Sequence, residues 1–247
     1  MGSGENSPAM VTPHQKIIGK VDAAHKRINL DTPYGFQENA DELSAKIEKY
    51  FEVNVGKPIS SVLHRNSQSH TPAEEIAQAD WVFSGPGSPT YALRVWQETG
   101  VDKALNEVLT RGAVVMASAA AMSLGAKVMP VYEMYKVGAD PHWLDGLNIL
   151  EPATGIRATV IAHYNNNQGG THDTRFCFVG GKRMNVLEEL LDSDVSILGI
   201  DEHTGVAFNL EERTAEIFGK GVVTIKNKKT EKTFEPKSIV PISDFQI

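Results

Sequence analysis

Apolar runs bounded by turn residues alternate with longer segments of helical periodicity along most of the 247 residues. Strands and helices that alternate in this way usually build a parallel sheet with helices on its faces. The sequence therefore predicts an α/β fold, in which a mostly parallel sheet lies between two layers of helices. A chain of this length is compatible with a single domain, and we expect residues 1–247 to form one.

The apolar runs give the expected strands, at residues 27–31, 60–63, 81–83, 113–117, 159–162, 196–200 and 206–209. Two further runs, at 215–218 and 222–226, are predicted to pair as an antiparallel hairpin. Helical spacing of apolar residues predicts helices at 40–51, 91–98, 101–109 and 185–191. At the start, Gly2-Ser3-Gly4-Glu5 resembles a loop that follows a first strand, so either that strand is lacking or the sheet begins with the next one.

Charge and composition exclude several classes of partner. The formal net charge is −7, whereas nucleic acids and anionic membranes attract basic surfaces. No apolar run approaches the length of a membrane span, and the first residues lack the features of a signal peptide. We therefore expect a cytoplasmic protein that binds neither nucleic acid nor membrane. The lysine-rich segment 226–232 is predicted to be a solvated turn or strand edge.

The single cysteine, Cys177, excludes a disulfide framework within the chain and any zinc site built from several cysteines. It lies in the apolar run Phe176-Cys177-Phe178, which favours a buried structural thiol over a nucleophile. His172 and Asp173 are the nearest approach to a metal-ligand cluster, and they offer too few ligands. We expect no metal and no other cofactor.

The segment Val114–Met122 carries the main indication of chemistry. A buried strand runs into Ser118 amid small residues and continues into a helix-compatible stretch. This is the pattern of a nucleophile elbow, whose sharp turn accepts only small neighbours and lifts the serine hydroxyl clear of the backbone. The same pattern also occurs as a simple packing solution at a strand–helix junction, so Ser118 is a candidate that needs support from elsewhere.

That support comes from a glycine-containing loop at the end of the predicted strand 81–83, where α/β proteins usually bind ligands. The backbone amides of Gly87, in this loop, and of Ala119, after the serine, could hold a reacting oxyanion. Ser88 is a candidate for binding substrate. The alternative is an ordinary strand-to-helix turn with prolines at the helix start.

His163 follows the apolar strand 159–162, at the same edge of a parallel sheet as the elbow. Imidazole suits proton transfer near neutrality, so His163 is the candidate general base for Ser118. Asp201 and Glu202 follow the strand 196–200, and either could orient the imidazole. We favour Glu202, while the neighbouring His203 could equally be a base.

The order of these segments resembles peptidase family S51, the dipeptidase E and cyanophycinase group, whose fold is like that of the class I glutamine amidotransferases. The matching segments are Gly2–Glu5, Gly85–Ser88, Ala117–Ala121, His163-Tyr164 and Gly199–Thr204. The resemblance implies a serine hydrolase with a Ser118–His163–Glu202 triad, acting on a small peptide or amino-acid-derived substrate.

Known members of this family cleave aspartyl or β-aspartyl bonds. In the cyanophycinase branch, arginines shortly after the histidine help to bind substrate, which makes Arg175 a candidate carboxylate clamp, with an ion pair as the alternative. Asn165 is a further candidate for binding substrate. A homodimer is compatible with the sequence.

Two departures from the family pattern bear on activity. The family elbow usually reads Gly-x-Ser-Ala-Gly-Ala, and Met116 and Ala120 replace its glycines. The segment 165–175 lengthens the region after the histidine. These changes leave a second hypothesis open, a catalytically silent relative that binds a small ligand or partner. A glutaminase is disfavoured because that chemistry uses a cysteine where Ser118 stands.

Overall fold

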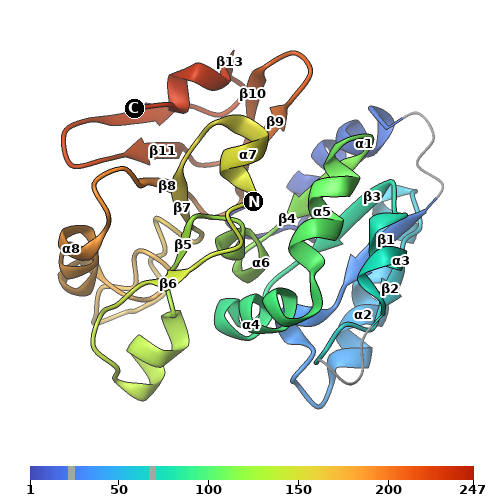
Figure 1. Ribbon diagram of the computed structural model, residues 1–247, viewed down its shortest axis with the longest axis horizontal. Coiled ribbons are helices and arrows are strands. Elements are labelled where there is room, and N and C mark those ends of the chain that lie inside the picture. The colour runs from blue at the N-terminus through green and yellow to red at the C-terminus, as the bar shows by residue number, and fades with distance from the viewer. Residues whose placement is uncertain (22–25, 67–70) are drawn as a thin grey trace.

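A computed structural model describes residues 1–21, 26–66 and 71–247. It has the predicted α/β architecture. One half is a parallel sheet in the order β2-β1-β3-β4, at the right of Figure 1. Its strands are β1 (Arg27–Leu30), β2 (Ser60–Val62), β3 (Trp81–Ser84) and β4 (Ala113–Met116). Each lies where the sequence predicts a strand.

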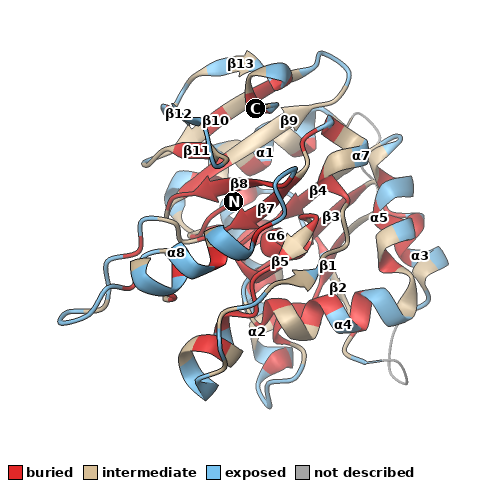
Figure 2. Cartoon of the chain, turned by 60° about the vertical axis from the view of Figure 1, so that its left-hand side comes forward, coloured by how far each residue is buried: buried red, intermediate tan, exposed pale blue. Residues whose placement is uncertain are grey.

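Side chains along a strand point alternately to the two faces of the sheet. In this sheet a different apolar cluster packs on each face. In β3, Trp81 and Phe83 pack in one apolar cluster with the helices α1 (Val11–Gly19) and α2 (Ala40–Tyr50). Val82 packs in another cluster with α3 (Ala73–Ala77), α4 (Pro89–Thr99) and α5 (Val101–Leu109). Figure 2 shows the central strands as buried and the outer faces of the helices as exposed.

The other half contains a mixed sheet in the order β12-β11-β8-β7, at the left of Figure 1. Here β7 (Ala158–Ile161) and β8 (Ser196–Ile200) are parallel, and β11 (Val223–Lys226) and β12 (Glu231–Phe234) are antiparallel additions. A separate antiparallel sheet joins β9 (Thr204–Asn209), β10 (Thr214–Gly219) and β13 (Ile239–Pro241). The helix α8 (Gly181–Leu190) buries Met184 and Leu187 against the apolar residues of β7 and β8.

The remaining elements are short. Two helices are α6 (Ala119–Ser123) and α7 (Leu150–Thr154), and a small ladder pairs β5 (Lys127–Val128) with β6 (Leu144–Asp145). Single turns of 3₁₀- or π-helix are η1 (Pro8–Met10), η2 (Thr32–Tyr34), η3 (Phe51–Val55), η4 (Glu133–Val137) and η5 (Ile242–Phe245).

The predicted hairpin between 215–218 and 222–226 is wrong. Instead, β10 pairs with β9, and β11 pairs with β8 and β12. Hydrogen bonds redirect the chain after β10: the Gly221 amide donates to Thr204 Oγ1 (2.8 Å), and the Val222 amide donates to Asp201 Oδ2 (3.0 Å). These bonds hold the connection against the end of β8, so the next strand joins the mixed sheet.

The start of the chain lies between the two halves (Figure 1). The Met1 amino group donates to the Met116 carbonyl (2.7 Å), and the Ser118 amide donates to the Met1 carbonyl (3.0 Å). The Gly2 amide donates to the Thr204 carbonyl (2.8 Å). Met1 and Gly2 therefore connect the end of β4 to β9, and the predicted loop Gly2–Glu5 begins at this junction.

His14 gives the fold a pH-dependent stability. Its buried imidazole lies at a steep angle to the rings of Phe51 and Phe83, and its Nε2 lies 2.9 Å from the Glu5 carbonyl oxygen. Loss of water around the ring lowers the pKa of His14 from 6.5 to about 4. The folded state therefore binds a proton less readily than the unfolded state, and stability is lost as pH falls from 6.5 towards 4.

We expect His14 to account for a loss of about 2 kcal/mol in unfolding free energy between pH 7.5 and pH 5. Urea unfolding at the two pH values measures the loss, and the variant His14→Gln, which does not titrate there, should reduce it by that amount. An equal loss in both proteins would assign the pH dependence to other groups.

Candidate active site

Ser118 lies at the turn between β4 and α6. Its backbone has φ 52° and ψ −119°, in a region that a residue with a side chain rarely adopts. Such a conformation costs roughly 1–3 kcal/mol and persists only where the surroundings hold it. Here the small neighbours Ala117, Ala119 and Ala120 are all buried around the turn. The chain thus forms the sharp elbow that the sequence predicts.

The Ser118 hydroxyl contacts His163, which follows β7. Ser118 Oγ lies 2.8 Å from His163 Nε2, and His163 Nδ1 lies 3.1 Å from Glu202 Oε1. An ionised carboxylate can only accept hydrogen bonds, so the proton of a neutral imidazole resides on Nδ1 and donates to Glu202. Nε2 is then left to accept the Ser118 hydroxyl proton. The structure brings the three predicted residues into one hydrogen-bonded chain.

A left-handed turn at Phe176–Phe178 holds His163 in place. All three residues of this turn have positive φ, between 56° and 69°. The Cys177 amide donates to the His163 carbonyl (3.2 Å), and the ring of Phe178 lies 6.5 Å from the imidazole. Loss of water around the thiol raises the pKa of Cys177 to about 12, so the thiol stays protonated and unreactive near neutrality.

The two acids after β8 have different partners. Asp201 Oδ2 accepts the Val222 amide, and burial raises the pKa of Asp201. Glu202 faces His163, and its Oε1 also accepts a hydrogen bond from Asn166 Nδ2 at 2.7 Å. Asn166 is 1% exposed. Sequence reasoning missed Asn166, because its contact with Glu202 joins residues from two separate strand ends and leaves no local pattern.

The predicted oxyanion residues supply two unoccupied amides. In residues 1–21, 26–66 and 71–247, the amides of Gly87 and Ala119 donate to no protein acceptor. By contrast, the amides of Ser118 and Ala120, on either side of Ala119, donate to the carbonyls of Met1 and Gly85. The loop of Gly87 is fixed by the Ser88 amide, which donates to the Pro33 carbonyl (2.8 Å). Neither amide is therefore committed to an acceptor among the described residues.

The other candidate residues have partners within the protein. Ser88 Oγ accepts the Tyr91 amide (3.1 Å) and caps α4, and Asn165 Oδ1 accepts the Glu202 amide (2.9 Å). The Arg175 guanidinium pairs with the Asp173 carboxylate through Nη2 (2.7 Å) and Nε (3.0 Å), so the ion-pair alternative holds for this arginine. That pair lowers the pKa of Asp173.

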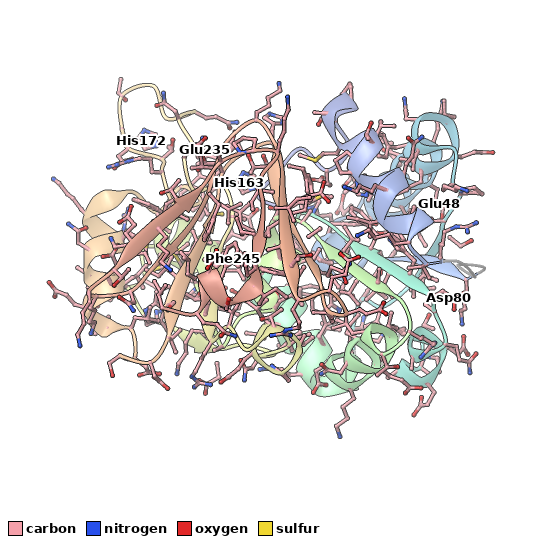
Figure 3. The ribbon with its side chains drawn as sticks, turned by 90° about the horizontal axis from the view of Figure 1, so that it is seen from above. Glu48, Asp80, His163, His172, Glu235 and Phe245 are labelled. Carbon is pink, nitrogen blue, oxygen red and sulfur yellow. The ribbon has the colours of Figure 1, made fainter. Side chains whose placement is uncertain are left out.

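The remaining histidines of interest lie apart from this chain of hydrogen bonds. His172 is exposed on the loop before Arg175, and Figure 3 shows it toward the edge of the molecule, whereas His163 lies nearer the middle. His203 packs against Gly4, where an added Cβ would lie 2.2 Å from its Nδ1. The arrangement at Ser118, His163 and Glu202 can activate a hydroxyl and place a proton on a leaving group.

The sequence profile of peptidase family S51 matches residues 1–217. The chain belongs to this family. Its fold is similar to that of two solved structures. One is a peptidase from an acI-B1 Actinobacterium, with 19% identity and a TM-score of 0.76 over 98% of this chain and 94% of the other. The second, a candidate peptidase E protein from Listeria monocytogenes EGD-e, has 14% identity and a TM-score of 0.52 over 95% of both chains.

No curated protein sequence matches this S51 chain. Within the part of the chain that the structure describes, no helix combines the length and the apolar character needed to cross a bilayer.

The elbow of this S51 chain forms despite the two replaced glycines. Met116 and Ala120 are buried in the same apolar cluster, at 4% and 0% exposure. The Ala120 amide still donates to the Gly85 carbonyl (3.3 Å), which ties α6 to the loop after β3. The added side chains are therefore accommodated in the core.

Proposed function

We propose that this protein is a serine peptidase that cleaves a peptide or amide bond of a small substrate in the cytoplasm, using Ser118 as the nucleophile. The observation that carries the proposal is the hydrogen-bonded chain from Ser118 through His163 to Glu202 at a strained elbow. A reducing compartment fits a chain with a single cysteine.

In the proposed reaction, Ser118 Oγ attacks the substrate carbonyl while His163 Nε2 takes its proton. Glu202 stabilises the imidazolium that results. The amides of Gly87 and Ala119 donate to the oxyanion of the tetrahedral intermediate. When the intermediate collapses, the imidazolium gives its proton to the leaving amine, and water then releases the acyl group by the same route.

The proposed substrate range includes the aspartyl and β-aspartyl bonds that the family resemblance implies. Ser88, Asn165 and Arg175 remain proposed substrate contacts. For Arg175, such a role requires the substrate to share or replace the Asp173 carboxylate. For Asn165, the amide group Nδ2 is available because only Oδ1 has a partner among the described residues.

A catalytically silent, ligand-binding protein is the second candidate. It is favoured by Met116 and Ala120, which replace the glycines of the usual family elbow. Both side chains pack in the core, and a side chain on either side of the strained turn can shift the Ser118 hydroxyl.

Labelling with a fluorophosphonate probe separates the two candidates, because only an activated serine reacts with it. We expect wild type to be labelled and Ser118→Ala and His163→Ala to be unlabelled. Ser123→Ala is the matched control, since Ser123 lies on α6 and its hydroxyl donates to the Ala119 carbonyl (3.1 Å). A folded wild type that takes no label would overturn the proposal in favour of the silent binding protein.

Gly87→Ala tests the proposed oxyanion loop. Gly87 has φ 149°, and an added Cβ would lie 1.9 Å from the Pro33 carbonyl oxygen, so the loop must shift. We expect the labelling rate to fall about 10²-fold, as for a lost oxyanion donor, and the unfolding free energy to fall by about 1–3 kcal/mol.

Gly56→Ala is the control for Gly87→Ala. Gly56 also has positive φ, 72°, but an added Cβ there meets nothing within 4 Å. This variant should lose stability and keep the wild-type labelling rate. Labelling of Gly87→Ala at the wild-type rate would show that its amide has no part in the reaction.

A further inference from the structure

A cavity of about 360 Å³ has Ser88, the residue after Gly87 of the proposed oxyanion loop, in its lining. Its walls come from the segment after η2, from the start of α4 and from the start of η4. They carry three aromatic rings, two charged groups and two hydroxyls, from Phe36, Tyr91, Tyr132, Arg94, Glu133, Ser88 and Thr90.

Two walls of the cavity connect it to the proposed catalytic residues. On one side, Ser88 directly follows Gly87 and is held by its bonds to Pro33 and Tyr91. A second wall residue, Tyr132, is connected to His163 through the contacts of two intervening rings. Tyr132 lies 6.1 Å from Tyr135, Tyr135 lies 5.6 Å from Phe178, and Phe178 lies 6.5 Å from His163. Ser88 thus places one wall of the cavity next to the proposed oxyanion loop, which the carbonyl attacked by Ser118 would approach, so the neighbouring residue of a peptide is the part that this cavity can receive.

The two charged groups of the cavity differ in their hydrogen-bond and ion-pair partners. Glu133 Oε2 accepts a hydrogen bond from Thr90 Oγ1 at 3.1 Å. Arg94 is exposed, and its guanidinium carbon lies 5.4 Å from the centre of the Tyr91 ring. In the described ranges it has no acidic partner and no hydrogen-bond acceptor. A guanidinium offers paired donors that match a carboxylate. The N–H groups of Arg94 are therefore available to bind the carboxylate of a ligand.

The aromatic walls indicate the size of the group that fits. Phe36 packs 5.2 Å from Tyr91 and is still 52% exposed, and Tyr132 is 38% exposed. Exposed rings that face a cavity favour an apolar group that covers them. An aspartate side chain has a single methylene and would leave most of these rings in water. A large apolar side chain would cover them.

We propose that this cavity binds the carboxy-terminal residue of a peptide substrate, with its free carboxylate on Arg94 and a large apolar side chain against Phe36, Tyr91 and Tyr132. This inference rests on the proposed peptidase function and names the substrate feature that the site selects. It makes Arg94 a specificity-determining residue.

Equilibrium binding tests the inference without any need for turnover. Calorimetry on the Ser118→Ala protein compares three ligands: N-acetyl-phenylalanine, N-acetyl-phenylalanine amide, and N-acetyl-aspartate α-amide, which keeps only the side-chain carboxylate. We expect the first ligand to bind about three- to fivefold tighter than the amide, because an ion pair with an exposed guanidinium is worth up to about 1 kcal/mol. The preference should weaken at high salt.

In the Ser118→Ala protein, a second substitution Arg94→Gln should abolish the preference for N-acetyl-phenylalanine over its amide. Arg94→Lys should keep part of this preference. Lys103→Gln, which removes one exposed cation from α5, is the matched control and should keep all of it. An unchanged preference in Arg94→Gln would overturn the inference. Equal or tighter binding of the aspartate ligand that is lost in Arg94→Gln would also overturn it, because Arg94 would then take a side-chain carboxylate. Aspartate binding that Arg94→Gln leaves unchanged belongs to the proposed aspartyl site and leaves the preference for N-acetyl-phenylalanine over its amide as the deciding result.

The test separates this inference from the proposed function. Probe labelling at Ser118 without an Arg94-dependent preference would overturn the specificity assignment and leave the peptidase intact. An Arg94-dependent preference for the acid, together with a wild type that takes no fluorophosphonate label, would support the carboxylate site and overturn the catalytic proposal.

Discussion

Ser118→Ala is expected to lower kcat for a short peptide by about 10⁴-fold or more, which is the scale seen when a serine peptidase loses its nucleophile. The reason is that no other group in the described site can form the acyl bond, since the Cys177 thiol is protonated with a pKa of about 12. The measurement is turnover of a panel of short peptides that includes aspartyl dipeptides.

The fold should survive this change. Alanine occupies the positions on both sides of Ser118. Among the described residues, the Ser118 hydroxyl bonds only to His163. We expect the urea midpoint of Ser118→Ala to stay within error of wild type, and Ser123→Ala to retain activity. Turnover by Ser118→Ala at more than a few per cent of the wild-type rate would mean that another group, or an activated water, attacks the substrate.

Glu202→Gln is expected to lower kcat by about 10³- to 10⁴-fold. The main reason is the loss of the carboxylate charge that stabilises the imidazolium formed when His163 takes the Ser118 proton. Glu202 Oε1 contacts both His163 Nδ1 and Asn166 Nδ2, so a glutamine carbonyl in that place keeps both contacts without the charge. A glutamine turned the other way would donate to His163 Nδ1 and move the imidazole proton to Nε2, which then cannot accept the Ser118 proton.

Asp201→Asn is the matched comparison for Glu202→Gln. Asp201 contacts the Val222 amide rather than His163, and an asparagine carbonyl can still accept that bond. We expect Asp201→Asn to keep kcat within about threefold of wild type, as a substitution outside the reacting groups does. A large loss in Asp201→Asn with little change in Glu202→Gln would reverse the assignment of the acid.

Much of the fold was open to prediction because its signals are local. Apolar runs and helical spacing act over a few residues, and they located β1 to β4, β7, β8 and the helices α2, α4, α5 and α8, but not α1. The pairing of strands is not local. The sequence of β10 and β11 is compatible with a hairpin, but β11 pairs with β8 and β12, and the bonds of Gly221 and Val222 hold the connection near the end of β8.

The candidate site also has one part that local sequence indicates and another that depends on tertiary contacts. The sequence by itself determined the candidates Ser118 and His163, because a serine amid small residues and a histidine after a buried strand are visible in short segments. Only the tertiary structure shows that Glu202 rather than Asp201 contacts His163, that Asn166 bonds to Glu202, and that Arg175 pairs with Asp173. The physical reason is that side-chain direction and hydrogen-bond partners depend on which strand ends meet in space, and residues far apart in the chain make those contacts.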